Sequence, residues 1–115
     1  MKENLTKKEQ LAQYKARTVV GGVYAIRNTI NQKRLIEGTV DMQGSRNRFT
    51  FAQSTSSCVH LKLQDDWRAQ GGGAFVFEVL EEMKKGETQT AEEFKADVEA
   101  LKELWMEKWT SDELY

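Results

Sequence analysis

Proline is absent from the 115-residue chain, and cysteine and histidine occur once each, as Cys58 and His60. A single cysteine excludes an internal disulfide and any zinc site built from several cysteines. No apolar run approaches the ~18 residues that a membrane-spanning helix needs. The lysine-bearing start of the chain also lacks the apolar core of a signal peptide. Together these absences predict a cytoplasmic protein that does not enter a membrane.

No proline-rich or serine-rich linker and no internal repeat marks a domain boundary. The length and the composition, 39% apolar and 30% charged residues, are typical of one globular domain with a modest core. We therefore expect a single domain over residues 1–115. Residues 1–18 are predicted to form a helical extension, and residues 110–115 a frayed tail.

The net charge of −1 conceals a strong asymmetry along the chain. Residues 1–50 carry a net charge of +6, residues 73–115 carry −7, and residues 51–72 are balanced. A basic half favours a polyanionic partner such as nucleic acid. The alternative, that the two halves pair with each other within the fold or between copies of the chain, stays open at this point.

Local patterns predict the first four elements. Thr6 and Glu9 have the spacing of a capping box for a helix over 4–17. Turn-prone residues separate two β-rich runs, which predicts a hairpin with strands over 20–29 and 33–40. Asp41 is a candidate N-cap for a helix over 41–54. On that helix Met42, Phe49 and Ala52 would share one apolar face.

The second half of the chain predicts two helices and one strand. A helix over 59–69 would end at three consecutive glycines, Gly71–Gly73. The nearly continuous apolar run over 74–80 predicts a central strand that is covered on both faces. Thr90 and Glu93 form a second capping box, which predicts a helix of about eighteen residues that ends near Trp109. The expected fold is α+β, a small three-stranded antiparallel sheet flanked by helices, in the order α-β-β-α-α-β-α.

Tyr24 is the residue on which a functional interpretation depends. Strand alternation places Tyr24 and Ile26 on one face of the hairpin. On residue type alone, Tyr24 is a half-buried strand aromatic that serves packing. Its sequence context adds a second interpretation, because Gly22-Val23-Tyr24 is followed after ten or eleven residues by Leu35-Ile36-Glu37 or Ile36-Glu37-Gly38.

Further motifs follow this pair in a fixed order: Asn47-Arg48-Phe49 in the predicted arginine-bearing helix, Cys58-Val59-His60 ahead of the next helix, the strand beginning Phe75-Val76-Phe77-Glu78, and a last helix rich in glutamate. The ordered set, from about Gly21 to Trp109, resembles the GIY-YIG nuclease superfamily, in particular its small single-domain bacterial members. The resemblance implies hydrolysis of DNA phosphodiester bonds with Mg²⁺ or Mn²⁺ as cofactor.

The resemblance also implies roles for individual residues. Tyr24 would help to activate water, which requires a nearby cation because the pKa of tyrosine is near ~10. Arg48, or as second choice Arg46, would stabilise charge on the phosphate with its planar fork of donors. The two arginines are two positions apart on a helix and cannot point the same way. His60, the only histidine, is a candidate proton carrier.

The metal ligand implied by the resemblance lies on the last helix. Glu103 is the first choice and Glu99 the second, and their spacing of four residues places both on one helical face. Carboxylate oxygens suit Mg²⁺, which takes few protein ligands and keeps several waters. The basic residues of the hairpin, Lys33, Arg34 and Arg27, are the candidates for binding the substrate.

The second motif departs from the family pattern, since Leu35 or Ile36 stands where a tyrosine is expected, and Glu37 adds a carboxylate. Three functions therefore remain in view: a divergent metal-dependent endonuclease, a nucleic-acid-binding module without catalysis, and a self-associating interaction domain. For each candidate there is also an ordinary alternative, with Arg48 and Glu103 as solvated surface charges and His60 as a hydrogen-bonded structural residue.

Overall fold

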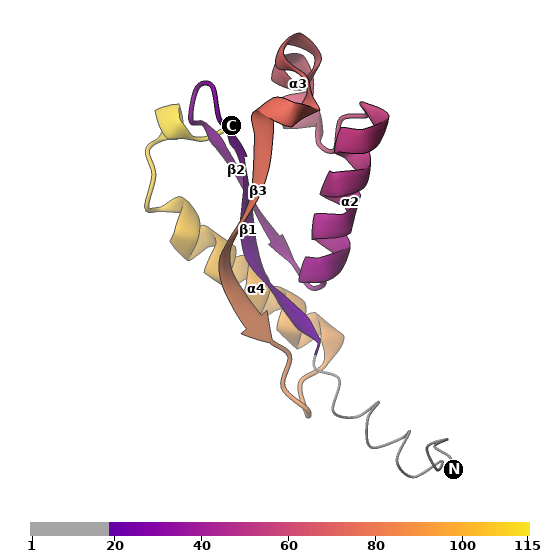
Figure 1. Cartoon of the computed structure of the whole chain (residues 1–115). Coiled ribbons are helices and arrows are strands. Elements are labelled where there is room, and N and C mark those ends of the chain that lie inside the picture. The colour runs from indigo at the N-terminus through magenta and orange to yellow at the C-terminus, as the bar shows by residue number, and fades with distance from the viewer. Residues whose placement is uncertain (1–18) are drawn as a thin grey trace, which may run out of the picture.

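A computed structural model describes residues 19–115 (Figure 1), so the helix predicted over 4–17 and the extension over 1–18 lie outside the described residues. No helix within the described range has the length and apolar character that crossing a bilayer requires. The elements, in chain order, are β1 (Val20–Asn28), β2 (Arg34–Thr39), α2 (Met42–Thr55), η1 (Leu61–Leu63), α3 (Gln64–Gln70), η2 (Gly72–Ala74), β3 (Phe75–Lys84), α4 (Ala91–Met106) and η3 (Ser111–Glu113).

The three strands form one antiparallel sheet in the order β2-β1-β3, with β1 in the centre. The predicted α+β fold class is thereby confirmed. The prediction that the strand beginning near residue 75 is central is wrong, because β3 lies at the sheet edge. Its second half, from Val79 to Lys84, is largely exposed, and the apolar run reflects only the first half of the strand.

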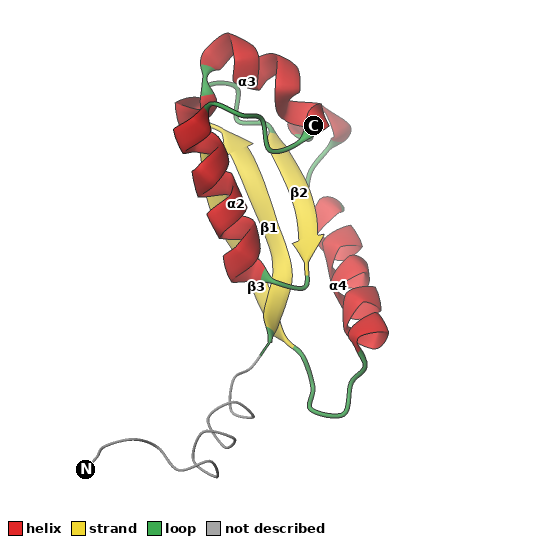
Figure 2. Ribbon diagram, turned by 90° about the vertical axis from the view of Figure 1, so that its right-hand side faces the viewer, coloured by secondary structure: helices red, strands yellow, loops and turns green. Residues whose placement is uncertain are grey.

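The two faces of the sheet carry separate cores. In the hairpin register Ile26 lies opposite Leu35 and Ala25 lies opposite Ile36, so the first pair faces one side and the second pair the other. Helices α2 and α3 cover the first face, and α4 covers the second (Figure 2). Tyr24 shares the face of Ile26 and packs against the α2 core.

Helix α2 begins as its sequence predicts. The Asp41 carboxylate accepts a hydrogen bond from the backbone N–H of Gly44 at 3.0 Å, which satisfies one of the donors that the first turn leaves unpaired. Helix α4 begins with the predicted capping box of Thr90 and Glu93 but ends at Met106, three residues before Trp109.

Two further predictions need correction. The helix predicted over 59–69 starts later, because His60 is extended and caps η1 with its side chain before α3 follows. The tail over 110–115 is not frayed. Leu114 forms a β-bridge with Arg34, and the Tyr115 hydroxyl donates a hydrogen bond to Asp66 at 2.7 Å.

The glycine of the first motif has a clear structural reason. Gly22 has φ of 136°, and a Cβ there would lie 2.0 Å from the carbonyl oxygen of Glu81, so only glycine lets β1 approach β3 this closely. Next to it the β1–β3 register shifts between Val23 and Tyr24. Such a bulge re-aims the neighbouring side chain, and here that side chain is Tyr24.

Candidate functional site

Tyr24 lies half-buried at the edge of the α2 core. Its ring stacks on Phe77 with ring centroids 4.5 Å apart and planes 20° apart. Burial raises the pKa of the phenol, and the charge of Glu37 raises it further; the Ser45 hydroxyl and the charge of Arg48 oppose part of the rise. The phenol is therefore neutral near pH 7 and available as a hydrogen-bond donor.

Glu37 connects Tyr24 to two other elements. It lies directly opposite Tyr24 in the hairpin register, so both side chains project from the same face. Its Oε2 atom is 3.8 Å from His60 Nε2 and 3.8 Å from Lys102 Nζ. Because β2 is an edge strand, the carboxylate can reach the loop before η1 and also the side of α4.

Arg48 is fixed by a chain of hydroxyl groups. Its Nη2 atom donates to Ser45 Oγ at 3.0 Å, and Ser45 Oγ bonds Thr39 Oγ1 at 2.8 Å. Ser45 is 3% exposed, and the sequence reasoning missed it as a site residue. Its position three residues after Met42 and four before Phe49 is the signal that could have placed it on the buried face.

The imidazole of His60 has a defined orientation. Nδ1 accepts a hydrogen bond from the backbone N–H of Lys62 at 3.1 Å, so in the neutral ring the proton is on Nε2, which is directed at Glu37. The Cys58 thiol bonds the His60 carbonyl at 2.9 Å instead of the ring. We call the assembled residues the tyrosine cluster: Tyr24, Glu37, Ser45, Arg48, His60 and Lys102.

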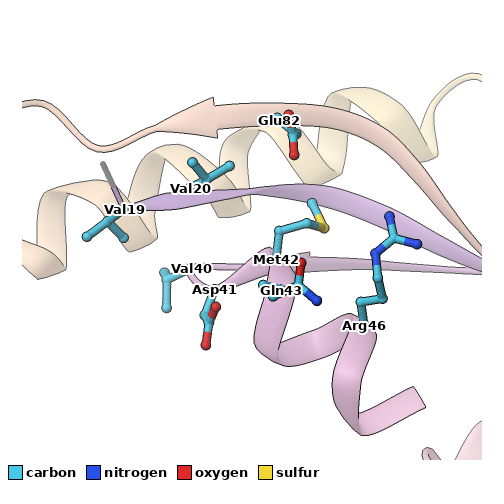
Figure 3. A pocket seen from close by; sticks show the side chains of 8 residues that line it. All are labelled: Val19, Val20, Val40, Asp41, Met42, Gln43, Arg46 and Glu82. Atoms are coloured by element: carbon cyan, nitrogen blue, oxygen red, sulfur yellow. The ribbon is translucent and has the colours of Figure 1, made fainter. Parts of the chain in front are cut away.

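Arg46 has a different environment from Arg48. Its guanidinium carbon lies 4.9 Å from the centroid of the Phe77 ring. It also lines a hollow of about 530 Å³ between the beginning of α2 and the end of β3, and Glu82 of β3 lines the same hollow (Figure 3). Arg48, whose charge acts on Tyr24, is the arginine that the structure brings to the cluster.

The structure does not bring Glu103 or Glu99 to the cluster. Both are exposed, and within residues 19–115 no hydrogen bond or ion pair joins either of them to it. Successive residues on an α-helix are rotated by about 100°, so Glu103 points well away from the direction of Lys102. The α4 side chain that does reach Glu37 is Lys102. The assignment of Glu103 and Glu99 as metal ligands stays a prediction.

The donor set of the cluster does not fit a resident divalent cation. Glu37 is its single carboxylate, and the Lys102 ammonium occupies one side of it. Across the described part of the chain, no three carboxylate, imidazole or thiol groups are close enough together to hold a metal ion. Mg²⁺ sites use one or two carboxylates together with waters and substrate phosphates, and a lysine beside the only carboxylate opposes such a site electrostatically.

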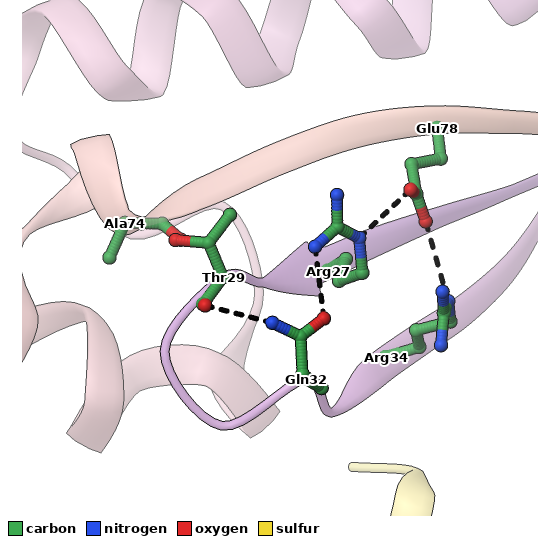
Figure 4. A network of polar contacts seen from close by, with 6 residues as sticks. All are labelled: Arg27, Thr29, Gln32, Arg34, Ala74 and Glu78. Carbon is green, nitrogen blue, oxygen red and sulfur yellow. Dashed lines mark hydrogen bonds and ion pairs between the residues drawn. The ribbon is translucent and has the colours of Figure 1, made fainter.

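The basic hairpin residues lie elsewhere. Arg27 and Arg34 oppose each other in the register, on the face of the sheet that α4 covers, and share the Glu78 carboxylate at 2.9 and 3.3 Å (Figure 4). Lys33 lies with its Nζ 5.8 Å from the centroid of the Tyr115 ring. The structure therefore places these three predicted substrate-binding residues apart from Tyr24, and that assignment too stays a prediction.

Comparison with solved structures now identifies the fold. The structure is similar to two structures of the catalytic domain of the intron homing endonuclease I-TevI, one of which is a mutant. The TM-scores are 0.57 and 0.60 at 21% and 20% sequence identity. The matches cover 77% and 83% of this chain and 82% and 95% of the other chains. The chain has a GIY-YIG-like fold. No protein-family model and no curated protein sequence matches it significantly.

The resemblance left two residues, Leu35 and Ile36, open at the second motif tyrosine, and the structure places them on opposite faces of the sheet. Leu35 lies on the Tyr24 face and is 2% exposed, whereas Ile36 faces α4. The position on the cluster side therefore carries an alkyl group without a hydroxyl. Glu37, two residues further along the same face, supplies the polar group of β2.

Alkaline pH should destabilise the protein through Tyr24. Because its folded-state pKa is raised above the unfolded value, this stability contribution is present below about pH 10 and is lost as the pH rises through the folded value. We expect Tyr24→Phe to reduce the fall in unfolding free energy between about pH 9 and pH 11, measured by urea titration. An undiminished fall in the variant would show that Tyr24 is not the group responsible.

Proposed function

We propose that this chain is a divergent endonuclease that binds DNA and hydrolyses its phosphodiester bonds at the tyrosine cluster. The observation that supports the proposal is convergence: β1, β2, α2, α4 and the loop before η1 bring a phenol, a carboxylate, an imidazole and two cations to one place. The names of the two structural neighbours, both endonucleases, agree with this chemistry.

Glu37 is the proton acceptor in this proposal. Tyr24 is protonated near pH 7, Arg48 and Lys102 are cations, and the acceptor nitrogen of His60 is already used by Lys62. Of the described residues in the tyrosine cluster, Glu37 is the one whose side chain offers a proton-accepting group beside the phenol. It can take a proton from water as the oxygen attacks phosphorus, and the ester oxygen that departs is protonated by solvent.

The cations and the phenol act on the phosphate. Arg48 offers a planar set of donors that matches phosphate oxygens, and Lys102 adds a compact charge. The Tyr24 hydroxyl donates a hydrogen bond to a non-bridging oxygen. These groups are held by protein contacts before substrate arrives, so they stabilise developing charge without reorganisation.

Metal dependence is a separate part of the proposal and rests on the resemblance. Mg²⁺ or Mn²⁺ would supply further charge neutralisation on the phosphate. Of the cluster residues, Glu37 is the one with ligand chemistry for such ions, and Glu103 or Glu99 would have to reorient to join it.

A binding module without catalysis is the second candidate. It is favoured by the alkyl side chain, of Leu35 or Ile36, at the second tyrosine position and by the Lys102–Glu37 ion pair. Such a module would keep the phosphate-binding cations and lose turnover. Its affinity for nucleic acid should fall steeply with salt, because phosphate contacts release counterions.

Nicking of supercoiled plasmid in Mg²⁺, in Mn²⁺ and in EDTA tests the proposal. We expect cleavage by the wild type and about ten-fold slower cleavage by Tyr24→Phe, the effect of one lost hydrogen bond to a charged group. Salt-dependent binding without nicking would replace the endonuclease by the binding module. If the protein neither binds nor nicks DNA, both functions are rejected. Sedimentation would then test self-association.

A further inference from the structure

A groove of about 510 Å³ adjoins the tyrosine cluster along the second half of α2. One wall is helical, and the other is the loop that leads from α2 to His60. Arg48 belongs both to this wall and to the cluster, so the groove opens directly beside the proposed phosphate site. The residues that line it are Asn47, Arg48, Phe51, Ala52, Ser57, Cys58 and Val59.

Phe51 is the prominent feature of this groove. It is 68% exposed, although its neighbours on α2, Phe49 and Ala52, are buried in the core. It follows Arg48 by three positions, so the ring and the guanidinium share one side of the helix. An exposed aromatic side chain next to a phosphate-binding arginine is the arrangement by which proteins hold single-stranded nucleic acid.

The chemistry of the lining favours a base over other ligands. Among the described residues that line the groove, Arg48 is the only ionised one, whereas a surface that follows a duplex backbone needs several cations. Phe51, Ala52 and Val59 offer apolar contact suited to the flat face of a base. Bases within a duplex already stack on each other, so only an unpaired base can stack on an exposed ring.

We propose that this groove binds an unpaired nucleobase, stacked on Phe51, next to the phosphate held by Arg48. This inference rests on the proposed function of the tyrosine cluster and adds a substrate class to it. The preferred substrate is single-stranded or locally unpaired nucleic acid.

Binding of a fluorescently labelled single-stranded oligonucleotide of about twelve residues, and of the duplex of the same sequence, tests the proposal by anisotropy in EDTA. Phe51→Ala should weaken single-strand binding about ten-fold or more, and duplex binding should be unchanged. Phe51→Trp should retain the affinity, because the larger ring still stacks. Leu61→Ala is the matched control, since Leu61 is 83% exposed and lies outside the groove.

Two results would overturn the inference. One is unchanged single-strand affinity in Phe51→Ala; an altered sedimentation coefficient in the same variant would then make Phe51 part of a protein interface. The other is an equal loss in Leu61→Ala, which would indicate a general surface effect. The proposed function fails separately, through absence of nicking, and a wild type that binds neither oligonucleotide removes both proposals.

Discussion

Glu37→Gln is expected to slow plasmid nicking by about 10²- to 10⁴-fold, the range in which a general base contributes. The amide has nearly the same shape as the carboxylate but cannot accept a proton from water. It also removes the negative charge that the His60 and Lys102 side chains face at 3.8 Å. Binding of DNA should persist, because Arg48 and Lys102 retain their charges and lose a competing anion. Initial nicking rates and anisotropy on the same preparations separate the two effects.

The matched variants for this experiment lie on α4. Glu92→Gln removes an exposed carboxylate in the first turn and should leave the rate unchanged. Glu103→Gln tests the residue that the family resemblance implies as the metal ligand. If Glu103→Gln loses activity and Glu37→Gln keeps it, the carboxylate of the last helix is the functional one, and the role proposed for Glu37 is wrong.

Lys102→Glu is expected to weaken DNA binding and to create a site for a divalent cation beside Glu37. In EDTA it should weaken DNA binding about 100-fold, because a charge-assisted contact of about 1.5–3 kcal/mol is lost and a repelling charge replaces it. It should also create Mn²⁺ binding, since two carboxylates would then face each other where the lysine now pairs with Glu37. Calorimetric titration with Mn²⁺ measures the second effect directly.

Lys95→Glu provides the control for net charge. Lys95 is exposed on the same helix and its replacement changes the total charge by the same amount. If Lys95→Glu weakens DNA binding as strongly as Lys102→Glu, the loss comes from the change in net charge, and Lys102 makes no specific contact with DNA. If Lys102→Glu gains no Mn²⁺ binding, the geometry at Glu37 does not accept a divalent ion even with a second carboxylate.

The sequence was informative wherever a local signal decides the outcome. The cap at Asp41 and the capping box of Thr90 both lie where the pattern placed them, since a cap depends on side chain and backbone a few residues apart. The hairpin strands followed from the two β-rich runs, and the ordered motifs indicated the GIY-YIG-like fold that the structural neighbours support. The strand over 75–84 shows the limit, because an apolar run does not say which neighbours pair with it.

The candidate site was predictable only in part. Tyr24 and Arg48 were found from motifs and lie together in the structure. Ser45 was missed because a single polar residue on an apolar helix face gives a weak signal. On α4, periodicity showed which side faces the sheet but not which of several charged residues reaches a carboxylate on another strand. Which charged residue of α4 reaches the carboxylate depends on the distance between α4 and the edge strand β2. Gly38 of β2 packs so closely against Val98 of α4 that a Cβ on Gly38 would lie 2.8 Å from Val98 Cγ1.

The sequence by itself determined the hairpin strands, the caps of α2 and α4, and the presence of an intact Gly22-Val23-Tyr24 motif, because these depend on contacts a few residues long. Only the tertiary structure decided what surrounds Tyr24. It placed Leu35 on the face of Tyr24, Glu37 opposite the phenol, and Lys102 beside that carboxylate. These residues are far apart in the sequence, and their meeting depends on sheet register and on the packing of α4, which no local pattern encodes.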